Sequence, residues 1–110
     1  MRVELLYWDD DPDYMAARQN LVEVLTEDAF ETPIQMVSVN SAADAELLGF
    51  PGSPTIRLDG TDIDPGSAGT IGLHLRDYPA DGEGTAHVPS KDLIRRALER
   101  ARGWGHMPRP

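Results

Sequence analysis

The chain has 110 residues, of which 19 are Asp or Glu and 10 are Lys or Arg, so its formal net charge is −9. This length allows one ordinary domain, and the absence of cysteine excludes disulfides, thiolate metal sites, iron–sulfur clusters and cysteine nucleophiles. No apolar run approaches the roughly 18 residues of a membrane span, and residues 1–4 lead into a strand-like segment without a signal-peptide cleavage site. We therefore expect a cytoplasmic protein with no membrane partner.

The first predicted element is a strand over residues 3–8, because this stretch is almost continuously apolar and bulky, as in a strand covered on both faces. A helix follows. Asp11 is its expected N-cap, and Pro12 suits the first helical position, where the missing N–H loses no hydrogen bond. The helix should end between residues 26 and 29. Its apolar face consists of Tyr14, Ala17, Leu21, Val24 and Leu25.

The next two elements are a second strand and a short helix. Residues 34–39 alternate well enough in polarity to predict a strand. Ser41 is the expected cap of the helix, with Asp44 in the capping-box position, and Gly49 should end it. The expected buried side of this helix is Ala42, Ala45, Leu47 and Leu48.

The second half of the chain begins with a predicted hairpin. Residues 55–58 and 61–64 are its strands, and Asp59-Gly60 is the two-residue turn whose positive φ angles match the twist of the strands. Residues 65–89 are irregular, and a loop of this length is either functional or mobile. Ser90 caps a last helix that runs to about residue 102, with core positions Leu93, Ile94, Ala97, Leu98 and Ala101.

This element order predicts an α/β fold with the sequence β-α-β-α-β-β-α. A right-handed crossover makes the first two strands parallel, and the hairpin adds two strands beyond the first. The result is a four-stranded mixed sheet with helices on both faces, which is the thioredoxin-like architecture. We expect a single domain over residues 1–102 and a flexible C-terminal tail over residues 103–110.

Charge is unevenly distributed along the chain. Residues 1–50 contain eleven acidic and two basic side chains, whereas residues 89–110 contain two acidic and six basic ones. We expect the basic end to pack against the acidic body or to stay solvated. The acidic whole repels phosphates, so we expect no nucleic-acid partner.

Four segments resemble small bacterial thioredoxin-like proteins, a group often labelled alkylmercury-lyase-like. Residues 5–14 resemble the family segment aromatic-x-x-x-Cys-Pro-Asn-Tyr, and residues 49–60 resemble its Gly-Ser-Pro-Thr segment. Residues 72–78 are similar to the segment Gly-Leu-x-Cys-Arg-x-Tyr, and residues 88–98 complete the match. The resemblance covers about residues 2–101 and implies a cis proline at Pro54.

Both family cysteines are missing. Asp11 stands at the position of the first and Leu75 at that of the second, so neither thiol–disulfide exchange nor organomercurial cleavage can be transferred from the resemblance. We therefore expect a redox-inactive binding or adaptor module that recognises a protein or peptide partner at the groove beside the cis-proline loop, where an extended peptide adds as a strand. The candidate binding residues are Trp8, Asp11, Tyr14, Ser53, Pro54, Thr55 and Arg76.

Two alternatives remain open. One is a thiol-independent enzyme or small-ligand-binding protein that uses Asp11, Tyr14 or Arg76 in the same groove. The other is a subunit of a homo- or hetero-oligomeric assembly, such as a homodimer, that docks through the basic last helix and Trp104.

No cofactor or metal is expected. Residues 9–13 hold four aspartates, whose oxygens suit hard cations, but their spacing matches no calcium loop. Capping and favourable charge at a helix N-terminus explain them better. The three histidines are too widely separated in sequence to indicate a metal site.

Overall fold

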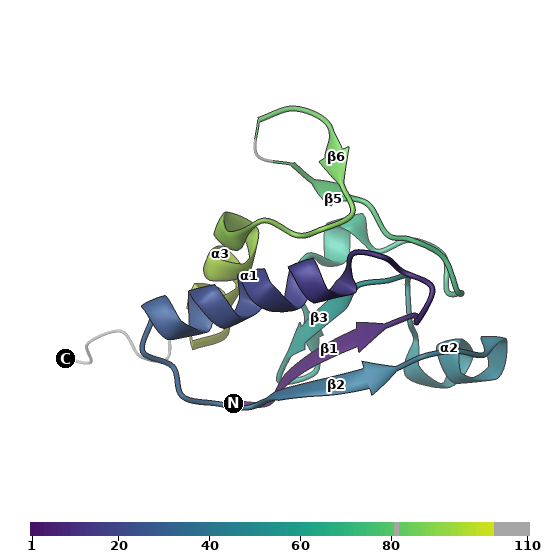
Figure 1. Cartoon of the computed structure of the whole chain (residues 1–110), viewed down its shortest axis with the longest axis horizontal. Coiled ribbons are helices and arrows are strands. Elements are labelled where there is room, and N and C mark those ends of the chain that lie inside the picture. Colours follow the sequence, from purple (N-terminus) through teal and green to yellow (C-terminus); the bar gives the residue numbers. More distant parts are fainter. Residues whose placement is uncertain (81, 103–110) are drawn as a thin grey trace.

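The computed structural model describes residues 1–80 and 82–102 (Figure 1). The predicted flexible tail over residues 103–110, with Trp104, lies outside them. The elements, in chain order, are β1 (Val3–Tyr7), α1 (Tyr14–Glu27), β2 (Ile34–Ser38), α2 (Ala42–Leu48), β3 (Thr55–Leu58), β4 (Thr61–Asp62), the 3-10 turn η1 (Pro65–Ser67), β5 (Tyr78–Pro79), β6 (Thr85–Ala86) and α3 (Lys91–Arg102).

The predicted four-stranded mixed sheet is present, with strand order β2-β1-β3-β4. β1 pairs in parallel with β2 and antiparallel with β3, with Leu5 opposite Ile56 and Leu6 opposite Thr55. Because successive side chains of a strand point to opposite faces, Leu5 and Leu6 belong to different cores. β5 and β6 pair with each other in a separate two-stranded sheet.

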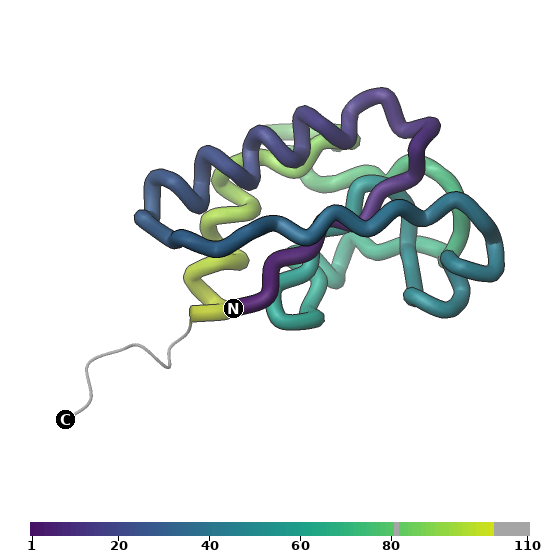
Figure 2. Tube along the Cα trace, turned by 60° about the horizontal axis from the view of Figure 1, so that its bottom comes forward, coloured from purple at the N-terminus to yellow at the C-terminus, as the bar shows by residue number. Residues whose placement is uncertain are grey.

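Helices α1 and α3 cover one face of the sheet, and α2 lies beyond the end of β2 (Figures 1 and 2). The larger core, between the sheet and α1 and α3, contains Leu5, Leu21, Ile56 and Ile94. A smaller cluster uses the other face and joins α2 to the sheet: Leu6, Val39, Ala45 and Phe50. In the described part of the chain, no helix has both the length and the apolarity needed to cross a membrane.

The turn and two of the caps are as predicted. Asp59 and Gly60 have φ angles of 51° and 84° at the hairpin. The Ser41 hydroxyl accepts the Asp44 N–H at 3.0 Å, and the Ser90 hydroxyl accepts the Leu93 N–H at 3.1 Å. These bonds satisfy amides that the first turn of a helix leaves without partners.

Three expectations about helix positions are wrong. The N-cap of α1 is Asp13, which makes no side-chain capping bond, so neither Asp11 nor Pro12 belongs to the helix. Leu47 is 83% exposed and Ala42 is exposed as well, because only Ala45 and Leu48 of the short helix α2 reach the second core. Ala101 is also exposed and lines a hollow beside the β3–β4 hairpin.

The basic last helix packs against acidic side chains of α1. Lys91 lies 3.2 Å from Glu23 and 2.8 Å from Glu27, and Arg95 lies 2.6 Å from Glu27. Hydrogen bonds from Lys91 and Arg95 lower the pKa of Glu27 below its ordinary value of 4.5. The charge contrast between the two ends of the chain therefore links α3 to α1.

We predict that Glu27→Gln lowers the melting temperature at pH 7 and that this difference from the wild type disappears well below pH 4.5. A carboxylate with a lowered folded-state pKa stabilises the protein above its unfolded-state pKa, and this contribution is lost as the pH falls through the folded-state value. Thermal unfolding at both pH values measures the effect. Glu46→Gln, at an exposed position of α2, is the control. An equal difference at both pH values would contradict the ion-pair account.

Candidate functional site

The candidate site is centred on the loop between α2 and β3. The Ser53–Pro54 peptide bond is cis, and residues 50–56 are all buried. The Trp8 N–H, at the end of β1, donates to the Ser53 hydroxyl at 3.0 Å. This loop is therefore enclosed by other parts of the chain, and Ser53, Pro54 and Thr55 are not exposed contact residues as the sequence suggested.

Asp11 is a buried carboxylate bonded to this loop. Only 1% of Asp11 is exposed. Its Oδ2 accepts the Ser53 hydroxyl at 2.7 Å, and its Oδ1 accepts the Asp13 N–H at 2.8 Å. The bond to Ser53 links positions 42 residues apart. Asp11 thus joins the segment before α1 to the cis-proline loop, instead of capping α1.

The backbone of Ser53 is paired with the chain itself. Its N–H donates to the His74 carbonyl at 2.8 Å, and its carbonyl accepts the Arg76 N–H at 2.8 Å. These bonds form a parallel bridge between Ser53 and Leu75. A peptide that adds as a strand at Ser53 would have to displace residues 74–76.

Arg76 holds this segment in place. Its guanidinium donates to both carboxylate oxygens of Asp62, at 2.7 and 2.9 Å, and to Thr55 Oγ1 at 3.0 Å. It also donates to the Asp64 carbonyl at 2.7 Å and to Ser67 Oγ at 3.1 Å. Bidentate pairs between Arg and a carboxylate combine charge with fixed geometry. With an exposed fraction of 2%, Arg76 joins four segments and is not an exposed loop residue.

Burial alone would lower the pKa of Arg76, but the hydrogen bond and charge of Asp62 outweigh it and raise that pKa. Arg76 therefore stays a cation. Its guanidinium lies 4.4 Å from the centre of the Tyr78 ring, and the Tyr78 hydroxyl donates to the Pro54 carbonyl at 2.5 Å. Burial raises the pKa of that hydroxyl. Among the described side chains, Arg76 Nε is the one buried polar atom without a hydrogen-bond partner.

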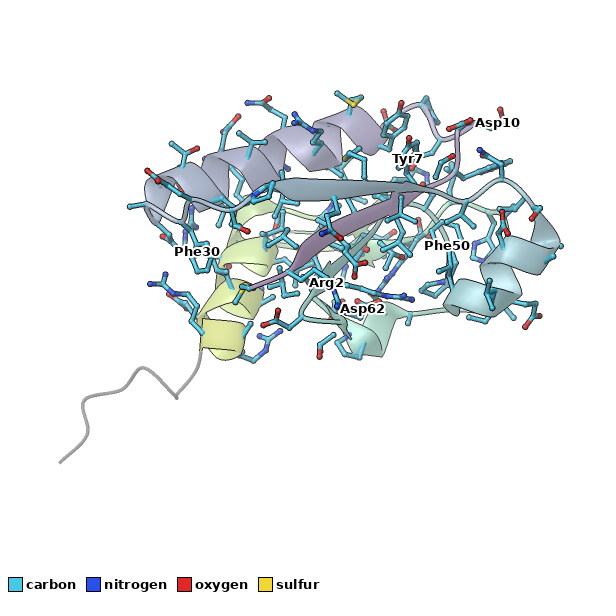
Figure 3. All side chains as sticks on the ribbon, turned by 90° about the horizontal axis from the view of Figure 1, so that it is seen from below. Arg2, Tyr7, Asp10, Phe30, Phe50 and Asp62 are labelled. Carbon is cyan, nitrogen blue, oxygen red and sulfur yellow. The ribbon has the colours of Figure 1, made fainter. Side chains whose placement is uncertain are left out.

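Aromatic and acidic side chains form the exposed rim of the site. Tyr14 stacks on Tyr7 with ring centres 4.3 Å apart, and both rings are half-buried, as is Trp8. Asp10 is exposed and lies at the same end of the molecule as Tyr7 (Figure 3). Asp9 is bonded to Asn40 and to Ser38. We call Tyr7, Trp8, Asp10 and Tyr14 the rim.

The structure distributes the seven predicted residues over two side-chain hydrogen-bond networks and two further positions. Trp8, Asp11 and Ser53 share one hydrogen-bond network, whereas Thr55 and Arg76 belong to the Asp62 network. Pro54 accepts the Tyr78 hydroxyl, and Tyr14 stands apart on the rim. Within residues 1–80 and 82–102, no group of three or more His, Asp or Glu side chains is arranged to hold a metal ion.

The predicted binding residues do not include Asp62, His74 or Tyr78, which the structure places in the site. The imidazole of His74 contacts the Thr70 carbonyl at 2.7 Å and the Leu75 carbonyl at 3.0 Å. A Cβ on Gly52 would lie 2.8 Å from His74 Cε1, and Gly52 has a φ of 113°, so this position requires glycine. The glycine directly before Ser53-Pro54 is a sequence signal that could have indicated the close approach of another segment here.

Comparison with known proteins identifies no relative of this chain. No family model, no curated protein and no solved structure matches the chain.

We predict that Asp11→Asn lowers the free energy of unfolding by about 1–3 kcal/mol. Both Asp11 oxygens accept hydrogen bonds, so an amide nitrogen in place of one of them leaves the Ser53 hydroxyl or the Asp13 N–H without an acceptor. Urea denaturation measures the change. Asp10→Asn, at an exposed position, should stay within about 0.5 kcal/mol of the wild type. Equal stability of the two variants would show that the buried carboxylate does not hold the loop.

Proposed function

We propose that this protein is a thioredoxin-like module without thiol chemistry that binds a protein or peptide partner beside the Ser53–Pro54 loop. The sheet order β2-β1-β3-β4, with β1 and β2 parallel, is compatible with that family of folds. The loop before β3 carries a cis proline, as the resemblance to thioredoxin-like proteins implies. Asp11 and Leu75 replace the family cysteines, so the proposed role is recognition without redox turnover.

The burial of Asp11 and Ser53 is the observation that favours this proposal over the enzymatic alternative. Their exposed fractions are 1% and 0%, and they hydrogen-bond to each other. A nucleophile or general base must come within hydrogen-bond reach of a substrate. The enzymatic alternative relied on Asp11, Tyr14 or Arg76, and Asp11 and Arg76 are enclosed by the chain.

One observation weakens the alternative in which the protein docks into an assembly through its last helix. Lys91 and Arg95 are engaged by carboxylates of α1, and Trp104 lies outside the described residues. The rim is a better partner surface. It combines half-buried aromatic rings with the exposed carboxylate of Asp10.

We propose that the partner segment carries an arginine or lysine. A cation above the Tyr7–Tyr14 stack gains a cation–π contact, and Asp10 supplies the opposite charge. The net charge of −9 raises the encounter rate with a cationic partner.

The test is a selection of random linear peptides on the immobilised protein, followed by measurement of Kd for the selected peptides. We predict that the peptides contain basic residues and that Tyr14→Ala and Asp10→Asn each weaken binding by about tenfold. Met15→Ala is the matched control, because Met15 is the next residue of α1 and is 53% exposed. Selected peptides that bind the rim variants and the control equally well would contradict the proposal, and so would a selection that yields no binder.

A further inference from the structure

A second surface, formed by residues other than the rim, has the features of a strand-addition site. β2 is an outer strand of the sheet, and no described strand pairs with its free edge. α1 runs alongside β2 (Figures 2 and 3). A hollow of about 480 Å³, within the volume range of ligand pockets, lies between α1, the connecting residues 29–33 and Ile34, the first residue of β2. Its apolar lining includes Val22, Leu25, Phe30, Pro33 and Ile34.

The free edge of β2 presents unpaired backbone groups. Val39 N–H donates to the Tyr7 carbonyl, and the parallel register places Ser38 opposite Tyr7. The backbone N–H and C=O groups of successive residues point to opposite sides of a strand. Those of residues 35, 37 and 39 therefore point toward β1, and those of residues 34, 36 and 38 point outward. An added strand would meet the N–H and C=O groups of these three outward-facing residues.

The edge lacks the features that usually block strand addition. β2 reads Ile-Gln-Met-Val-Ser, with no charged residue and no proline. Edge strands are normally protected by lysines, prolines or bulges. Met36, at the centre of β2, is 36% exposed.

Arg18 indicates what the groove would bind. It lines the hollow and is half-buried. Glu31 also lines the hollow, but no carboxylate of the described residues, Glu31 included, lies within ion-pair distance of Arg18. Its neighbours one turn away on α1 are Tyr14, Met15, Leu21 and Val22, none of which is acidic. A guanidinium in a partly apolar hollow is complementary to a carboxylate.

We propose that the groove between α1 and β2 binds an extended peptide segment that adds as a strand to β2. Alternate side chains of the peptide point toward α1, so an apolar one enters the hollow lined by Val22, Phe30 and Ile34. A carboxylate of the peptide pairs with Arg18. This carboxylate is either the C-terminus or an acidic side chain, and both offer the same chemistry. The inference does not depend on the rim.

The test is a selection of random linear peptides on the Tyr14→Ala variant, in which the rim is altered. We expect the selected peptides to alternate apolar residues and to lose about tenfold or more in affinity with Arg18→Gln. Arg96→Gln, on the exposed side of α3, is the matched control. Amidation of the peptide C-terminus distinguishes the two sources of the carboxylate.

Two further measurements test strand addition itself. Met36→Pro removes an outward N–H of β2 at an edge position where proline is tolerated, and it should abolish binding. In case this variant does not fold, peptides N-methylated at alternate positions remove the donors of the added strand and should lose affinity in one register only. Equal affinity of all N-methylated peptides, no effect of Arg18→Gln, or a selection without binders would overturn the proposal. So would a dimer in sedimentation that Met36→Pro dissociates, because a second copy would then occupy the edge.

Discussion

Ser53 forms four hydrogen bonds to three other segments of the chain, and the arrangement of the site depends on them. Its hydroxyl accepts the Trp8 N–H at 3.0 Å and donates to Asp11 at 2.7 Å, while its backbone bonds to His74 and Arg76 at 2.8 Å each. Ser53 has no exposed surface, so the loss of any of these bonds leaves a buried polar group unpaired. This constraint fixes the end of β1, the entry to α1 and the segment of residues 74–76 relative to one another.

The hydrogen bonds of Arg76 also limit where a partner can bind. Arg76 and its bonds to Asp62, Asp64 and Ser67 fix residues 74–76 against the β3–β4 hairpin. The backbone beside the cis proline, which an extended ligand would otherwise use, is therefore occupied by the chain. The two recognition surfaces that we propose therefore lie outside this closed centre: the aromatic and acidic rim, and the free edge of β2 beside Arg18.

Most of the fold could be predicted because its signals are local. Apolar periodicity located the strands of the main sheet and the helices, serine caps marked the starts of α2 and α3, and the Asp59-Gly60 pair indicated the hairpin turn. Strands β5 and β6 lie in residues 65–89, which we expected to be irregular. The site could not be predicted in the same way. An aspartate before a helix can cap it or accept a distant hydroxyl, and only the tertiary structure, through the bond from Ser53, decides between the two roles for Asp11. Arg76 lies in a segment without periodicity, so nothing local indicated that Asp62, 14 residues earlier, would bury it.

The most direct test of this account is amide hydrogen exchange at Ser53 and Arg76, measured by NMR. The account predicts that both N–H groups exchange as slowly as the Ile63 N–H, which bonds to the Ile56 carbonyl in the hairpin, because the parallel bridge is part of the folded core. Fast exchange at Ser53 and Arg76 in a protein whose Ile63 amide is protected would contradict it. The segment of residues 74–76 would then open readily, and the backbone beside Pro54 would be free for a ligand.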